Sequence, residues 1–180
     1  MRVSLFFLSN GNASEPKIHT ESPRPRILNE ETAVVKFLRE HYGITVSKLT
    51  RLVGYVDLNY HVTARDVQSN LYIDEVPGEG FFLKISNSDD SKRPAFLSAV
   101  TAMMEHLRQK GLACQKTVRS ISGHMITQIS SPSCSSGRPV TYLASVRTFL
   151  PGQVLARTRL SPQMLYDLGA FTAHLTQSLQ

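Results

Sequence analysis

The chain has 180 residues, of which 41% are hydrophobic and 19% are charged, so it can form a packed globular domain and long disorder is excluded away from its ends. Its 20 Lys and Arg residues exceed its 14 Asp and Glu residues, for a formal net charge of +6, which suits an anionic ligand such as a nucleotide phosphate or a nucleic acid. The basic residues are scattered, which disfavours nucleic acid. No apolar run approaches the ~20 residues of a membrane span, and the two cysteines lack zinc-ligand spacing. We therefore expect a cytoplasmic protein with neither a nucleic-acid nor a membrane partner.

The first part of the chain is predicted to be a polar arm followed by a helix. Residues 1–28 are expected to form a flexible arm, because residues 9–28 are polar and rich in proline. A helix is then expected, with Asn29 as its N-cap and Gly43 as its end. Its apolar stripe consists of Val34, Val35, Phe37, Leu38 and Tyr42.

Two strands are predicted to follow this helix. The first runs from residue 44 toward residue 52, and the second, over residues 55–62, is entered through a polar turn. A further strand around residues 71–73 could extend the second one.

The strand after the turn at Pro77–Gly80 carries a single lysine among apolar residues. Phe82, Leu83 and Ile85 suit a buried strand and surround Lys84. A buried ammonium group is costly unless an anion meets it. In kinase-like folds that anion is a nucleotide phosphate, held by a strand lysine beneath a covering hairpin. The alternative interpretation is an edge lysine whose stem reaches out to water.

A second helix is predicted over residues 94–111. Pro94 suits its first position, and Gly111 suits its C-terminal end. The apolar stripe of this helix is interpreted as core and consists of Phe96, Val100, Met103, Met104 and Leu107.

The remaining residues are predicted to form a strand pair and a last helix. Strands are expected at residues 125–129 and 140–146, with a loop between them at residues 131–138. Ser161 and Pro162 are an N-cap and first-position pair, and an apolar helical pattern continues from them to the last residue.

Several of these blocks occur together, in the same order, in one family of small-molecule kinases. They are Tyr-x-Asp-x-Asn-Tyr-His-Val at 55–62, Phe-Leu-Lys-Ile-Ser-Asn at 82–87, the helix end at 107–111, Thr-Phe-Leu-Pro-Gly at 148–152, and the segments 161–166 and 179–180. The chain resembles the aminoglycoside phosphotransferase and choline kinase family, and within it the kinases that act on 5-hydroxylysine. The resemblance extends from about residue 42 to the end of the chain.

The resemblance implies an α+β fold. It implies a protein-kinase-like small lobe, built from an antiparallel sheet plus one helix, and then the first helix of a truncated second lobe. The chain is divided accordingly into the arm at 1–28, a nucleotide-binding lobe at 29–150, and the hinge exit with the first helix of an incomplete C-terminal lobe at 151–180. The implied reaction transfers the γ-phosphate of GTP or ATP, with Mg²⁺, to the hydroxyl of 5-hydroxy-L-lysine.

The resemblance also implies a set of cofactor-binding residues. They are Lys84 on the donor phosphates, Tyr55, Asp57 and Asn59 in the turn that covers the phosphates, and Phe149, Leu150 and Gly152 in the hinge that meets the base. Ordinary turn chemistry is the alternative interpretation of Asp57 and Asn59.

The sequence departs from the family in the expected partner of the strand lysine. The family places a glutamate on the following helix, and the matching position here is Ser98. Glu105 lies on the same helix face but ~10 Å further along the axis. Asp89 or Asp90 could substitute from the preceding loop.

A further departure concerns catalysis. No histidine of the chain is followed two residues later by aspartate, so the catalytic and metal loops of the family are absent and no catalytic or metal-binding residue is assigned. The chain is expected to be part of a longer enzyme, inactive alone, with self-association through its exposed final helix. The alternatives are a non-catalytic nucleotide-binding or regulatory fragment and, less favoured, a basic nucleic-acid-binding domain.

Overall fold

The computed structural model describes residues 24–27, 30–131, 139–153, 155 and 158–180. Most of the predicted arm, the proposed N-cap Asn29 and the predicted loop at 132–138 lie outside these residues. None of the described helices is long and apolar enough to cross a bilayer. The described elements are α1 (Glu30–Tyr42), β1 (Ile44–Leu52), β2 (Leu58–Val67), β3 (Phe81–Ile85), the 3₁₀-helix η1 (Asp90–Lys92), α2 (Pro94–Gln109), β4 (Thr117–Val118), β5 (Thr127–Ser131), β6 (Val140–Thr148) and α3 (Pro162–Ser178).

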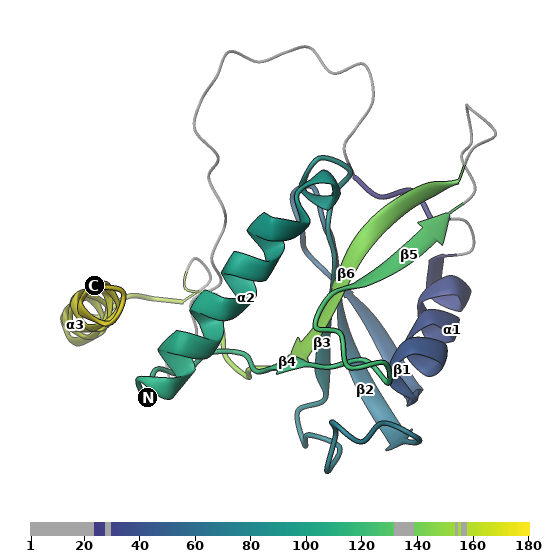
Figure 1. The fold of residues 1–180 in the computed structure, drawn as a ribbon. Helices are drawn as coiled ribbons and strands as arrows, with labels where there is room; N and C mark the ends of the chain where they lie inside the picture. Colours follow the sequence, from purple (N-terminus) through teal and green to yellow (C-terminus); the bar gives the residue numbers. More distant parts are fainter. Residues whose placement is uncertain (1–23, 28–29, 132–138, 154, 156–157) are drawn as a thin grey trace.

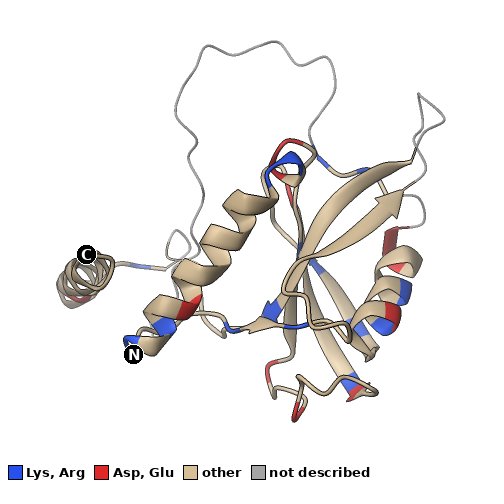
Figure 2. Ribbon diagram, in the orientation of Figure 1, with Lys and Arg blue, Asp and Glu red and all other residues tan. Residues whose placement is uncertain are grey.

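The strands form one antiparallel sheet in the order β1-β2-β3-β6-β4, and β5 also pairs with β6. The strand β3 therefore lies inside the sheet, between β2 and β6. The helices α1 and α2 lie on opposite sides of this sheet (Figure 1). Lys and Arg residues are distributed over several elements rather than gathered in one patch in the view of Figure 2.

The hydrophobic core lies between α1 and one face of the sheet. The buried residues of α1 are Val34, Phe37, Leu38 and Tyr42, and they pack on buried side chains of β2, β3, β5 and β6. The Tyr42 hydroxyl lies 3.1 Å from Thr127 Oγ1, and burial raises the pKa of Tyr42 to about 12. The predicted helix and its apolar stripe are thus confirmed, apart from Val35, which is exposed.

The predicted extension of the second strand around residues 71–73 is wrong. The strand β2 ends at Val67, and Leu71 is exposed. The cause is the buried Asn70 side chain, whose Oδ1 accepts from the Tyr72 N–H at 3.0 Å and whose amide donates to the carbonyl oxygens of Tyr42 and Arg119. Asparagine side chains that bond the backbone two residues on form turns in place of strands.

The helix α2 covers the opposite side of the sheet only loosely. Thr101 and Leu107 are its buried residues, whereas Phe96 is exposed. The interpretation of its apolar stripe as core is therefore wrong for Phe96, and Met103 and Met104 are only half-buried. The physical reason is that α1 already covers the main apolar face of the sheet. On the opposite face, Phe82 lies among polar and charged residues that include Lys84 and Arg147.

The helix α3 begins as predicted. The Ser161 hydroxyl accepts a hydrogen bond from the Met164 N–H at 3.2 Å, with Pro162 in the first turn. Figure 1 shows α3 beyond α2, away from the sheet. None of its residues is buried, and the His106 ring on α2 lies 2.8 Å from the Ser178 carbonyl oxygen.

Candidate nucleotide-binding site

The turn between β1 and β2 brings Asp57 and Asn59 close to its own backbone. A Cβ atom on Gly54 would lie 2.6 Å from the Asp57 carbonyl oxygen and 2.7 Å from Asn59 Nδ2, so only glycine fits without a shift. The register of the sheet then places Asn59 directly opposite Lys84. The tight turn therefore lies against the strand that carries the lysine.

Lys84 forms an ion pair with Asp57. Its ammonium group donates to Asp57 Oδ2, and the two side chains are only 26% and 13% exposed. The other carboxylate oxygen, Oδ1, accepts from the backbone N–H of Asn87 at 2.8 Å and from its side-chain amide at 2.9 Å. The carboxylate thus holds the lysine and the end of β3 in place together.

The pKa of the Asp57 carboxyl reflects two opposing causes. Burial alone would raise it, but the Lys84 charge and the hydrogen bonds from Lys84 and Asn87 outweigh burial. The net pKa lies below its ordinary value, so the carboxylate is charged at neutral pH. The Lys84 ammonium group and the two N–H donors of Asn87 stabilise the charged form of the carboxyl group.

Asp89 and Asp90 bind the loop instead of the lysine. The Asn87 Oδ1 atom accepts from the backbone N–H groups of both residues at 3.0 Å, and Asn87 Nδ2 donates to Asp90 Oδ2 at 2.9 Å. The expectation that Asp89 or Asp90 substitutes for the helix glutamate is wrong, because Asp57 does so. Ser98 is exposed on α2.

Glu105 pairs on its own helix. Its carboxylate accepts from Arg108 at 2.7 Å and 2.9 Å, and this interaction with Arg108 holds its pKa below the ordinary value. As the sequence indicated, it does not serve Lys84.

The predicted hinge segment begins at the end of β6. The Phe149 N–H donates to the Gly80 carbonyl oxygen at 3.0 Å, and its ring stacks on the His61 ring at a centroid distance of 3.9 Å. Leu150 is half-buried and Gly152 is exposed. The sequence did not single out His61, although its place one residue after Tyr60 puts it on the face opposite the core.

Of the predicted turn residues, Tyr55 lies at the surface. It is 91% exposed, and its carbonyl oxygen accepts from Arg24 at 3.2 Å. The structure therefore brings Asp57, Asn59 and Lys84 together and leaves the Tyr55 side chain at the surface. The nucleotide roles of all the predicted residues stay predictions.

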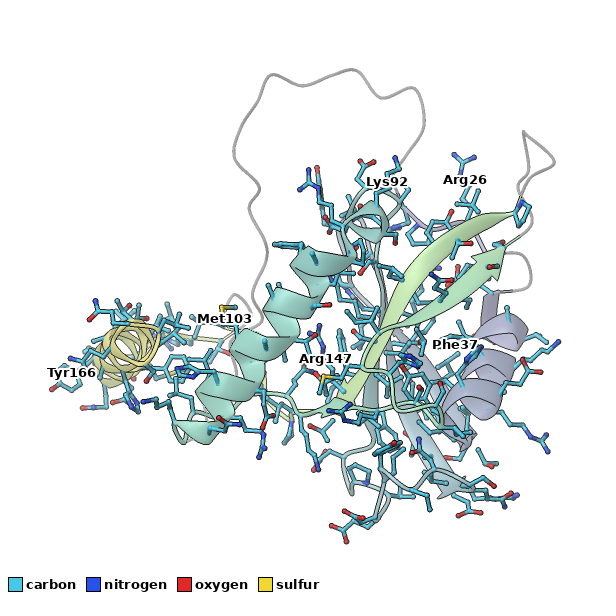
Figure 3. All side chains as sticks on the ribbon, viewed as in Figure 1. Arg26, Phe37, Lys92, Met103, Arg147 and Tyr166 are labelled. Carbon is cyan, nitrogen blue, oxygen red and sulfur yellow. The ribbon has the colours of Figure 1, made fainter. Side chains whose placement is uncertain are left out.

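The sheet face that carries Lys84 is arranged in rows across the strands. One row is Asn59, Lys84 and Ser145, and the next is His61, Phe82 and Arg147. Arg147 lies on the side of the sheet away from Phe37 of α1 (Figure 3). Sequence reasoning missed Arg147, although a lone arginine inside the apolar strand at 140–148 was a signal.

The described residues do not form a metal centre. In the part of the chain that the structure describes, no three His, Cys, Asp or Glu side chains gather as a metal site requires. The oxygen ligands that Mg²⁺ prefers are thus not grouped here, and no step is assigned to a metal on this chain.

Comparison with curated proteins shows what the chain is similar to. It is 33% identical to hydroxylysine kinase of Danio rerio over 159 residues, which is 87% of this chain and 40% of that protein. It is 31% identical to hydroxylysine kinase of Bos taurus over 139 residues, which is 77% of this chain and 35% of that protein. The chain matches part of hydroxylysine kinase. It spans well under half the length of these relatives, and no family model matches it.

Comparison with solved structures shows the fold. Amicoumacin kinase hAmiN, solved in complex with AMP-PNP, Ca²⁺ and Ami, matches 83% of this chain and 40% of its own, with a TM-score of 0.60 and 20% sequence identity. The predicted α+β, protein-kinase-like architecture is therefore confirmed.

Proposed function

We propose that this chain is the nucleotide-binding lobe of a small-molecule kinase of the hydroxylysine kinase type. The observation that carries the proposal is the Lys84–Asp57 ion pair beneath the β1–β2 turn. A mostly buried ammonium group held in one orientation, close to a covering turn, is the arrangement that phosphoryl-transfer folds use to hold donor phosphates. The kinase names of the relatives support it.

In this proposal the residues have separate tasks. Asp57 orients the ammonium group of Lys84, which contacts the phosphates of GTP or ATP. Asn59 supports the site because its Oδ1 atom is buried and has no hydrogen-bond partner among the described residues, and buried polar atoms in that state suit a ligand donor. Phe149, Leu150 and Gly152 face the base.

The proposed reaction is transfer of the γ-phosphate to the hydroxyl of 5-hydroxy-L-lysine, with Mg²⁺ as the metal. We assign nucleotide binding, and no catalytic step, to the residues of this chain. General-base catalysis needs a group within hydrogen-bond reach of the acceptor hydroxyl, and the sequence contains no His-x-Asp pair.

Lys84→Ala tests the nucleotide proposal. A charge-assisted contact contributes about 1.5–3 kcal/mol, so this variant should bind GTP and ATP about 10- to 100-fold more weakly and guanosine almost as before. Calorimetry with the three ligands measures this. Lys48→Ala is the control, because Lys48 is exposed on β1. Equal losses for nucleotide and nucleoside would place Lys84 outside a phosphate site.

The 180-residue chain alone should transfer no phosphate. The reason is that its sequence has no His-x-Asp pair and that its described residues hold no group of carboxylates such as phosphoryl transfer uses. An assay of GTP- and ATP-dependent phosphorylation of 5-hydroxylysine measures this. Turnover that Lys84→Ala abolishes would contradict the expectation.

A further inference from the structure

Arg147 is a buried charge without a partner in the described structure. The residue is 9% exposed, and its Nε atom is buried without a hydrogen bond. None of the ion pairs and hydrogen bonds found among the described residues involves its side chain. Burial lowers the pKa of this guanidinium, yet arginine remains charged in proteins. The fold therefore holds a positive charge that nothing described in it neutralises.

The place of this charge is close to Lys84. Arg147 is opposite Phe82 in the β3–β6 register, and Lys84 is two residues further along β3, on the same face. Such diagonal neighbours on paired strands are about 7–8 Å apart, within reach of one another's long side chains. One extended ligand can therefore contact both cations.

The acidic residues of the site already have partners. Asp57 pairs with Lys84, Asp89 pairs with Lys92, and Asp90 accepts a hydrogen bond from Asn87. No ion pair among the described residues reaches Arg147. A buried unpaired charge is strongly unfavourable, so an anion that enters this face would be bound with little reorganisation of the protein.

We propose that Arg147 is a second anion-binding residue of this site and donates hydrogen bonds to the phosphate chain that Lys84 also contacts. The inference rests on the proposed nucleotide-binding function and adds a cation to it. The guanidinium fork suits phosphate because it offers two parallel N–H donors. The polyphosphate of a nucleotide and a free inorganic polyphosphate share this chemistry.

Two results should follow from Arg147→Met, which removes the charge and keeps a long side chain. Without ligand, the melting temperature should rise, because the variant no longer bears the cost of burying a charge that nothing pairs with. In binding measurements, the affinity of the variant for tripolyphosphate and for GTP should fall about 10- to 100-fold. A residue whose charge is satisfied within the chain would give the opposite melting result.

The experiment uses the full 180-residue chain. Calorimetry and thermal melts are run with sodium tripolyphosphate, GTP and guanosine on the wild type, Arg147→Met, Lys84→Met and Arg65→Met. Arg65 is exposed on β2 and controls for net charge. Arg147→Lys is the second variant; it keeps a charge without the fork and should lose less affinity than Arg147→Met.

The expected pattern is a loss of tripolyphosphate and GTP affinity in Arg147→Met, unchanged affinity in Arg65→Met, and a higher melting temperature of ligand-free Arg147→Met. If Arg147→Met lost affinity for tripolyphosphate but not for GTP, Arg147 would not contact the phosphates of a nucleotide, and the inference would be overturned. Wild-type affinity in Arg147→Met, beside a loss in Lys84→Met, would overturn the inference and leave the proposed function standing. Failure of the wild type to bind either phosphate ligand would overturn both. A lower melting temperature of Arg147→Met without ligand would also overturn the inference.

Discussion

At the scale of single residues, Asp57 has the most connections in the site. One oxygen accepts from Lys84 and the other from two donors of Asn87. The carboxylate thereby joins the β1–β2 turn, β3 and the segment that leads to α2. Its loss should disturb the position of Lys84 as well as its charge.

Asp57→Asn should change the pH dependence of stability. The lowered pKa in the folded protein means that Asp57 stabilises the fold fully above its ordinary pKa, near 4. This contribution is lost as the pH falls further, through the lowered folded value. The variant should be about 2–3 kcal/mol less stable than the wild type at pH 7, and the difference should shrink toward pH 2.

Urea denaturation at several pH values measures this difference. Asp74→Asn is the control, because Asp74 is an exposed carboxylate. A difference between Asp57→Asn and wild type that stays constant from pH 7 to pH 2 would contradict the assignment.

The sequence predicted which residues lie at the candidate site better than it predicted how they pair. Lys84 was identified from its apolar neighbours, since a strand pattern is a local property. Its pairing with Asp57 was missed because it depends on the turn geometry and on the register that sets Asn59 opposite Lys84. Nothing in the spacing of 57 and 84 encodes that register.

At the scale of elements, the junction between α1 and β1 depends on Gly43. Its φ is +68°, and an added Cβ would lie 1.8 Å from the Gln68 carbonyl oxygen. The Gly43 carbonyl oxygen itself accepts from the Gln68 N–H at 2.9 Å. The close approach therefore fixes the end of β2 against the start of β1.

Gly43→Ala should destabilise the protein by about 3 kcal/mol or more, because left-handed strain of about 1–2 kcal/mol adds to a backbone clash. Gly111→Ala separates the two effects, since Gly111 has φ +84° but open space around an added Cβ; its cost should be about 1–2 kcal/mol. Gly78→Ala, with open space and no positive φ, should stay within about 0.5 kcal/mol of wild type. Equal costs in urea denaturation would refute the clash.

Elements with a strong local pattern were predicted, and those set by tertiary contacts were not. The signals at Ser161 and Pro94 are local, and the structure has Ser161 as the N-cap of α3 and Pro94 as the first residue of α2. The strand β4 has only Thr117 and Val118, and it exists because they pair with β6. Two residues carry no periodicity from which to predict a strand.

At the scale of the whole molecule, α3 exposes apolar surface. Leu165 is 53% exposed and Leu179 is 45% exposed. Burial of a large apolar side chain contributes about 1.5–3 kcal/mol, so two such residues represent a substantial part of the ~5–15 kcal/mol stability of a domain. Contiguous exposed apolar surface favours association.

The isolated chain should therefore self-associate through α3. Light scattering over a range of concentrations measures this, and the double variant Leu165→Gln, Leu179→Gln should shift the population toward monomer. Val53→Gln is the control, since Val53 is a highly exposed apolar residue away from α3. A wild-type chain that stays monomeric at all concentrations would refute the expectation.

The two register shifts in β1 have a consequence for aggregation. They lie between Thr45 and Val46 and between Val46 and Lys48, on an edge strand of the sheet. Irregular pairing and a lysine on an edge disrupt the straight row of backbone donors and acceptors that a strand from another molecule would need. At the other end, the edge of the sheet is divided between the two-residue β4 and the five-residue β5. The β1 edge is thus a poor template for fibril growth.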